Sequence, residues 1–195
     1  MKITYTVEFF SYWHCGSGLA AGADVDALVI KDKNKLPYIP GKTIKGLIRE
    51  AVEDIFTFSK MNLDSNSINN KLNSINDAFG YFDDKLDKEK GCMFFSNATL
   101  PEDIAKVIRG KKQQEYLYKS VSSTSIDDKG IAKEHSLRRI EVAVPCTLEG
   151  YIMNVPDDLS NDIESALSYI KRLGVNRNRG LGRCCFTIKT KEESK

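Results

Sequence analysis

The sequence has little of what a disulfide-linked, zinc-binding or membrane-spanning protein needs. Its five cysteines are odd in number and form no C-x-x-C pair, which argues against a disulfide framework and against a zinc site. No apolar run is long enough for a signal peptide or a membrane span. We therefore expect a cytoplasmic protein with reduced thiols and no membrane contact.

Nucleotide motifs and a strong overall charge are missing as well. The sequence matches neither the phosphate loop G-x-x-x-x-G-K-[ST] nor the dinucleotide motif G-x-G-x-x-G, which argues against a nucleotide cofactor. A net charge of +2 is too small by itself to indicate nucleic acid. The charge is unevenly distributed, however, because residues 165–191 contain no Asp or Glu and seven Lys and Arg. This local segregation favours an anion-binding surface.

At 195 residues the chain has the length of one domain. Apolar patterning predicts strands over residues 3–9, 25–30, 92–100, 140–148 and 184–188. Helical spacing of apolar residues predicts helices over 44–55 and 163–173. The main elements follow the order strand, helix, strand, strand, helix, strand, which is the ferredoxin-like βαββαβ pattern of α+β proteins and of RNA-recognition motifs.

Two polar stretches interrupt this pattern. Residues 59–90 are rich in Asn, Ser, Asp and Lys, and we expect an insertion that is partly helical and packs loosely on the surface. Residues 101–110 favour a short helical turn, and residues 113–139 form a charged excursion between two strands.

The loop Gly174–Arg183 combines three glycines with three arginines. Glycines free the backbone to approach a ligand, and the planar guanidinium groups of Arg177, Arg179 and Arg183 suit phosphate. A plain helix-to-strand connection with solvated arginines is the alternative, but the lack of acidic residues nearby in the sequence favours anion binding.

The stretch Leu36–Arg49 joins a proline-bracketed turn to the start of the first helix. Unpaired N–H groups and the positive end of the helix dipole attract anions at such a start, and Lys42, Lys45 and Arg49 add positive charge. Gly46 lies in the helix interior, where glycine costs about 1 kcal/mol relative to Ala, which indicates close packing or close approach of a ligand. The alternative is a solvated helix face.

Asp24 and Asp26 precede a short apolar run and share one face of an extended chain, about 7 Å apart. Such a pair could hold a hydrated Mg²⁺, which uses one or two carboxylates together with substrate phosphates. Spacing alone favours a polar loop before a strand. His14 and His135 give weaker signals, since a lone histidine is more often structural.

Four blocks of the sequence, in this order and spacing, resemble the RAMP superfamily of CRISPR-associated proteins, specifically the repeated backbone subunit of type III RNA-guided effector complexes. The blocks are His14–Gly18, Asp26–Asp32 with Pro37–Arg49, Ser125–Val142, and Asn178–Arg183. The resemblance covers most of the chain. It implies a single domain, with a ferredoxin-like palm (1–58, 91–112 and 140–190), an inserted lid region (59–90) and a thumb hairpin (113–139).

The resemblance also implies that the palm grips guide RNA and that the thumb wedges between bases of the guide–target duplex. The residues it places near RNA are His14, Ser17, Lys42, Thr43, Lys45, Arg49, Arg138, Arg139, Arg177, Arg179, Gly180, Gly182 and Arg183. The implied partners are guide CRISPR RNA, target RNA, other effector subunits and copies of this chain along the RNA.

In the family, an aspartate before the short second strand cleaves target RNA with a divalent metal, and the matching residue here is Asp26. The implied cofactor is Mg²⁺ or Mn²⁺, with Asp24 as a weak second ligand. The ribose 2′-hydroxyl would attack the adjacent phosphate and leave a 2′,3′-cyclic phosphate and a free 5′-hydroxyl. The chain departs from the family where Lys42 and Thr43 replace serines and where Asn97 replaces a common aspartate.

Three alternatives stay open. The chain could be a non-catalytic backbone subunit of the same machinery, or a RAMP endoribonuclease that processes guide precursors with His14. It could also be a generic RNA-recognition module, which stacks bases on exposed aromatic residues of its central strands. The candidates for such stacking are Tyr5, Phe9, Phe94 and Phe95, although core packing explains them more simply.

Overall fold

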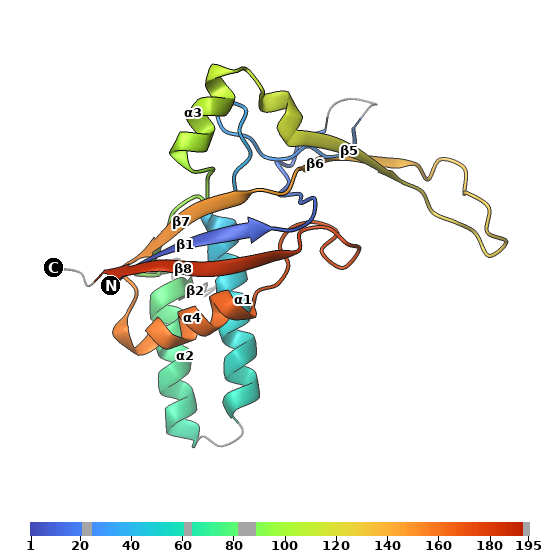
Figure 1. Ribbon diagram of the computed structural model, residues 1–195. Helices are drawn as coiled ribbons and strands as arrows, with labels where there is room; N and C mark the ends of the chain where they lie inside the picture. Colours follow the sequence, from blue (N-terminus) through green and yellow to red (C-terminus); the bar gives the residue numbers. More distant parts are fainter. Residues whose placement is uncertain (21–24, 61–63, 82–88, 193–195) are drawn as a thin grey trace.

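A four-stranded antiparallel sheet forms the centre of the molecule in the computed structural model, which describes residues 1–20, 25–60, 64–81 and 89–192 (Figure 1). Its strands, in the order in which they lie side by side, are β4 (Phe94–Phe95), β7 (Thr147–Met153), β1 (Lys2–Phe9) and β8 (Cys184–Glu192). Helices α1 (Gly41–Ser59) and α4 (Ser160–Tyr169) cover one face of this sheet. The ferredoxin-like α+β fold predicted from the βαββαβ order is therefore confirmed.

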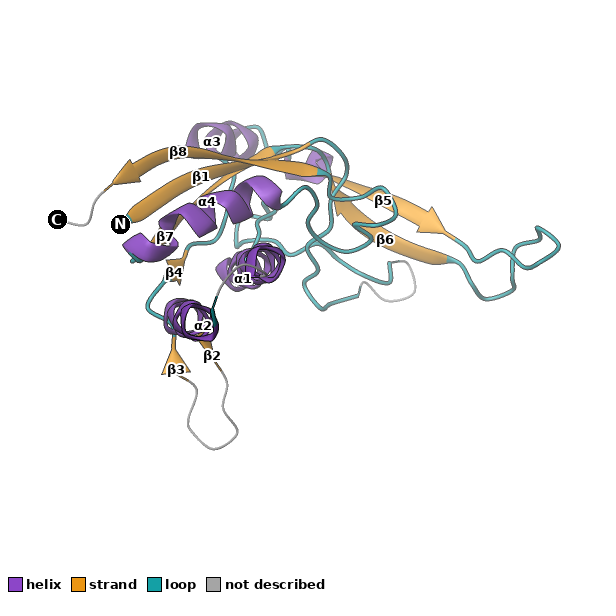
Figure 2. Cartoon of the chain, turned by 90° about the horizontal axis from the view of Figure 1, so that it is seen from below, coloured by secondary structure: helices purple, strands orange, loops and turns teal. Residues whose placement is uncertain are grey.

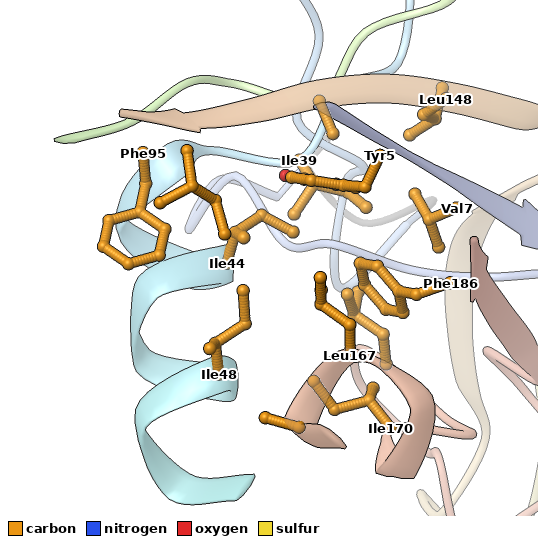
Figure 3. Packing of buried hydrophobic residues seen from close by; sticks show 14 of the residues in the cluster. Tyr5, Val7, Ile39, Ile44, Ile48, Phe95, Leu148, Leu167, Ile170 and Phe186 are labelled. Atoms are coloured by element: carbon orange, nitrogen blue, oxygen red, sulfur yellow. The ribbon is translucent and has the colours of Figure 1, made fainter. Parts of the chain in front are cut away.

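The core lies between this sheet and the two helices (Figure 3). Helix α1 buries Ile44, Ile48 and Val52 at the predicted helical spacing. Figure 3 shows Ile44 and Ile48 facing Leu167 of α4, beneath Tyr5 of the sheet. Because full burial of a large aliphatic side chain contributes about 1.5–3 kcal/mol, this layer holds both helices on the sheet.

The 59–90 insertion is more closely packed than we expected. Helix α2 (Ser65–Phe79) is capped at its N-terminus by Asp64, whose carboxylate accepts hydrogen bonds from the first turn, and it lies beside α1 (Figure 1). Its last turn buries Ile75, Ala78 and Phe79 in the core. The short strands β2 (Gly80–Tyr81) and β3 (Glu89–Lys90) then pair with each other. The prediction of helix was right, and that of loose packing was wrong for this last turn.

The predicted strand over 140–148 is in fact two strands that belong to different sheets. Strand β6 (Arg138–Ala143) pairs with β5 (Tyr118–Ser123) in a hairpin, whereas β7 joins the central sheet. The break falls at Pro145, which has no N–H to donate and so cannot continue the ladder. The β5–β6 hairpin projects from the body of the molecule (Figure 1 and Figure 2).

Three other elements differ in extent from their predictions. In 92–100 only β4 is regular, followed by isolated bridges from Ala98 to Ile39 and from Thr99 to Glu149. The 25–30 run makes single bridges at Ala27 and Val29 instead of a strand. Helix α4 ends at Tyr169, four residues before the predicted end, although Leu173 stays buried.

The remaining elements are helical and short. Residues 101–110 form the full helix α3 (Glu102–Gly110), and the 3₁₀ helices η2 (Gln114–Leu117) and η3 (Asp157–Leu159) precede β5 and α4. All five cysteines are free thiols. Within the described residues, no helix is both long and apolar enough to cross a membrane.

Candidate nucleic-acid interface

The loop that follows β1 is anchored by His14, which is almost fully buried. Its Nδ1 lies 2.6 Å from the carbonyl oxygen of Glu141 on β6, and its own carbonyl accepts the Val175 N–H at 2.9 Å. Ser17 has a similar role, since its hydroxyl donates to the Leu28 carbonyl at 3.0 Å. Both side chains thus hold backbone segments together. The structure leaves His14 little surface for contact with RNA.

Two glycines of the Gly174–Arg183 loop are needed for packing of backbone on backbone. A Cβ atom on Gly174 would lie 2.3 Å from the His14 carbonyl oxygen, and one on Gly182 would lie 1.9 Å from that of Leu173. Gly180 has a positive φ of 91° but open space around it, so its surface is accessible to a ligand. The expectation of close ligand approach therefore applies to Gly180 and not to the other two.

The three arginines of this loop are exposed. Arg177 lies 3.5 Å from Glu50 of α1, a solvent-exposed ion pair that contributes little to stability. The Arg183 guanidinium carbon lies 6.0 Å from the centre of the Phe10 ring. Glu50 could not be foreseen from the loop, because the loop has no acidic residue of its own and this partner comes from another element.

The start of α1 is less open to an anion than its sequence suggests. The Gly41 N–H donates to the Asn97 side chain at 2.9 Å, and those of Thr43 and Ile44 donate to the Pro40 carbonyl. Three of the first four N–H groups of the helix therefore have partners, and Asn97 acts as a cap supplied from the segment after β4. This helix start therefore offers phosphate its positive side chains and at most the N–H group of Lys42.

Lys42 is exposed and Lys45 is half-buried on the first turns of α1. Thr43 and Lys42 lie next to Cys15 of the loop after β1: burial raises the pKa of the Cys15 thiol, and a hydrogen bond to Thr43 and the charge of Lys42 partly oppose that rise. Gly46 is exposed, and a Cβ atom there would contact nothing. Close packing against the described residues therefore does not explain Gly46. The other explanation given by the sequence is close approach of a ligand.

Arg49 occupies a different position from the other predicted cations. Its guanidinium donates to Glu53 at 2.6 Å, to the Gly80 carbonyl at 2.5 Å and to the Asn76 side chain at 3.1 Å. All three of its nitrogens are engaged, and they tie α1 to the end of α2. The structure thus gives Arg49 a role in packing α1 against α2. Its contact with RNA stays a prediction.

Asp26 is exposed and is joined to the start of β6, at the end of the β5–β6 ladder next to the hairpin loop, by a reciprocal pair of hydrogen bonds. Its N–H donates to the Arg139 carbonyl at 2.7 Å, and its Oδ2 accepts the Arg139 N–H at 2.7 Å. The side chains of Arg138 and Arg139 are exposed beside it. One carboxylate oxygen of Asp26 is therefore used for positioning, and Oδ1 is the oxygen that can meet a ligand.

Glu141, two residues further along β6, fixes the rest of this segment. Its Oε2 accepts the Val29 N–H at 3.0 Å, its Oε1 pairs with Lys31 at 2.8 Å, and its own N–H donates to the Ala27 carbonyl. Lys31 in turn lies 4.0 Å from the centre of the Tyr118 ring on β5. Sequence reasoning missed Glu141, since a glutamate on an alternating strand reads as solvent-facing.

Few side chains around Asp26 could bind a divalent cation. Among the described residues, no group of three or more His, Cys, Asp or Glu side chains is arranged to hold a metal. Asp24, the weak second ligand, lies outside the described residues. Asp26 Oδ1 alone satisfies the minimum for Mg²⁺, which binds through one or two carboxylates when substrate phosphates and water complete its shell.

The aromatic residues expected for an RNA-recognition motif are mostly in the core. Tyr5, Phe9 and Phe95 are buried, and only Phe94 is exposed, 6.1 Å from Tyr151 on β7. This burial removes most of the support for base stacking on the central strands.

Comparison with known proteins places this arrangement in a family. A profile of the RAMP superfamily matches residues 6–185. A chain of the type III-B Cmr-beta bound to cognate target RNA has a TM-score of 0.67 at 11% identity, covering 96% of this chain and 97% of that chain. The apo state of the type III-B Cmr-beta gives 0.67 at 14% identity with the same coverage. A chain of a type IV-B CRISPR complex gives 0.67 at 11% identity, covering 100% of this chain and 93% of that chain.

None of the curated proteins matches the sequence. At such low identities the structural matches establish the fold alone. The family profile adds more, because it extends from β1 through the Asp26 segment and the β5–β6 hairpin to the Gly174–Arg183 loop and the start of β8. The chain belongs to the RAMP superfamily.

Proposed function

We propose that this chain is a guide-RNA-binding backbone subunit of a type III CRISPR effector complex, in contact with copies of itself along the guide and with other subunits. The observation that carries the proposal is that exposed cations from distant parts of the sequence lie around the loop after β1. Arg177 and Arg179 are on the Gly174–Arg183 loop, which hydrogen-bonds to this loop at His14, and Lys42 on the first turn of α1 lies next to its Cys15. Exposed cations in such a cluster are what a sugar-phosphate backbone requires. A structural relative bound to cognate target RNA supports it.

The finer part of the proposal is cleavage of guide-matched target RNA at Asp26. The ribose 2′-oxygen would give its proton to solvent and bond to the adjacent phosphorus. The bond from that phosphorus to the 5′-oxygen would break, and the 5′-oxygen would take up a proton from solvent. Asp26 would hold a Mg²⁺ or Mn²⁺ ion against that phosphate, where the ion supplies neutralisation of the developing charge. Arg139, through its backbone N–H, would keep the carboxylate in one orientation.

A non-catalytic backbone subunit remains the second candidate. It is favoured by the limited set of metal-binding side chains around Asp26 in the described part of the chain. The third candidate, processing of guide precursors by His14, loses support because that imidazole is buried and engaged with the Glu141 carbonyl.

Replacement of Asp26 by alanine separates these candidates. The complex should be assembled with guide RNA and Mg²⁺ and given labelled target RNA. We expect Asp26→Ala to slow cutting by about a hundredfold or more while guide binding stays unchanged. Asp103→Ala, which removes an exposed carboxylate from the first turn of α3, is the matched control and should cut normally. If the wild-type complex does not cut, the non-catalytic candidate stands.

A further inference from the structure

The segment Phe9–Trp13 divides its aromatic residues between the core and the surface. Phe9 and Trp13 are buried and stack at 4.6 Å, whereas Phe10 is 52% exposed and Tyr12 is 41% exposed. The packing of the described residues does not explain why two large aromatic residues within three positions are exposed to solvent. It indicates a surface that binds something with an apolar face.

Both exposed residues are held on a rigid backbone. The Phe10 N–H donates to the Arg183 carbonyl at 2.9 Å, and the Tyr12 carbonyl accepts the Gly182 N–H at 2.7 Å. The hydroxyl of Ser11 between them accepts the Arg183 N–H at 3.0 Å. Because this segment is already ordered, stacking on it loses little conformational entropy.

The same hydrogen bonds join the two aromatic residues to the arginines of the Gly174–Arg183 loop. Arg183 approaches the Phe10 ring, and Arg177 and Arg179 lie on the same loop. A partner for this surface must therefore present negative charge beside flat apolar faces. Unpaired nucleotides do so, whereas a duplex hides the faces of its bases.

We propose that Phe10 and Tyr12 form a stacking site for unpaired nucleobases of RNA whose phosphates contact the Gly174–Arg183 loop. The proposal rests on the RNA-binding function proposed above and adds to it a contact with the bases. Stacking of this kind tolerates any sequence, because every base has a π face.

The test compares two oligomers of equal length, a single-stranded RNA and an abasic ribose-phosphate chain, by fluorescence anisotropy with the full chain. We expect Phe10→Ala and Tyr12→Ala each to weaken binding of the RNA by about fivefold to a hundredfold. Neither variant should change binding of the abasic oligomer. The dependence of RNA affinity on salt should keep its slope, because the cations that meet the phosphates are unchanged.

Phe94→Ala is the matched control, because Phe94 is also 52% exposed but lies beside Met153 at the opposite end of the sheet. It should leave both affinities unchanged. Phe10→Leu keeps apolar bulk without a π face and should behave like Phe10→Ala, while Phe10→Trp should retain affinity. Phe10→Leu and Phe10→Trp together show whether RNA binding needs an aromatic ring at this position, even if Phe10→Ala fails to fold.

Equal weakening of both oligomers, or of neither, would overturn the stacking site. So would loss of self-association by Phe10→Ala with RNA affinity intact, which would make the patch an interface between copies of the chain. If the wild-type chain binds neither oligomer, the proposed RNA-binding function itself is wrong. The two failures are therefore distinguishable.

Discussion

Two tyrosine hydroxyl groups differ in their hydrogen bonding, and we expect them to contribute to stability with opposite signs. Tyr5 is fully buried beneath the sheet, and its hydroxyl has no hydrogen-bond partner among the described residues. The Tyr118 hydroxyl instead donates to the Lys35 carbonyl at 2.8 Å. Burial raises the pKa of both groups, so both stay neutral at physiological pH. A buried hydroxyl without a partner has given up its bonds to water without replacement.

We therefore predict that Tyr5→Phe stabilises the protein by about 1 kcal/mol, because it removes an unsatisfied polar atom and keeps the ring. Tyr118→Phe is the matched comparison and should destabilise by a similar amount, since it deletes a hydrogen bond. Urea unfolding of the three proteins measures both differences. A Tyr5→Phe variant less stable than wild type would show that the hydroxyl does have a partner.

At the scale of elements, the Asp26 segment and strand β6 behave as one unit. Glu141 accepts the Val29 N–H and pairs with Lys31, and Arg139 holds the Asp26 carboxylate. The β5–β6 hairpin is thus coupled directly to the proposed catalytic residue. A shift of β6 would move Asp26 with it.

We predict that Glu141→Ala speeds hydrogen exchange at the Val29 amide and slows target cutting without weakening guide binding. The reason is that the segment loses its anchor while the RNA-binding cations are untouched. Glu141→Gln keeps an acceptor for Val29 and should retain most of the protection and most of the cutting. If Gln and Ala variants cut equally slowly, Glu141 acts through its charge and not by positioning.

The Gly174–Arg183 loop gives a second prediction at this scale. An alanine at position 182 would need a positive φ and would place its Cβ on the Leu173 carbonyl, whereas one at position 180 needs only the positive φ. We expect Gly182→Ala to destabilise by at least about 3 kcal/mol and Gly180→Ala by about 1 kcal/mol. Thermal melting of the two variants checks the order. Equal losses of stability would mean that the loop moves away easily.

How far the sequence predicts each element depends on whether its signal is local. The helix at Ile44–Ile55 and the alternation at Ile3–Phe9 follow from apolar period alone, and both are confirmed. The division of 140–148 between two sheets depends on which distant strand each half meets, although Pro145 marks the break. The capping of α1 by Asn97 is likewise a contact over 56 residues that no spacing reveals.

The same limit applies to the candidate site. Lys42, Arg177 and Arg179 were predicted because charge segregation and glycine spacing are visible in the sequence, and the structure leaves them exposed. Burial of His14 and the engagement of Arg49 with α2 depend on packing, which the sequence does not display. Phe10 and Tyr12 were not predicted, because the sequence does not show that Phe9 and Trp13 are buried while the two aromatic residues between them are exposed.

For the whole molecule, the loop after β1 hydrogen-bonds to the Gly174–Arg183 loop and lies next to Lys42 at the start of α1. The proposed function requires the cations of these segments to act as one basic surface. We predict that replacing Arg177 and Arg179 together by glutamine lowers the slope of log affinity against log salt by about 0.7 for each phosphate that these two arginines neutralise. Arg109→Gln, which removes a cation paired with Glu102 on α3, is the control and should keep the slope. An unchanged slope in the double variant would place RNA elsewhere.

The most direct test of the central claim is a cryo-EM structure of the assembled complex with its bound guide. We predict that the sugar-phosphate backbone of the guide passes Lys42 and the Gly174–Arg183 loop, with Asp26 facing the target strand. Guide RNA bound instead on the open face of the sheet, around Phe94 and Tyr151, or a complex without RNA at this chain, would contradict it.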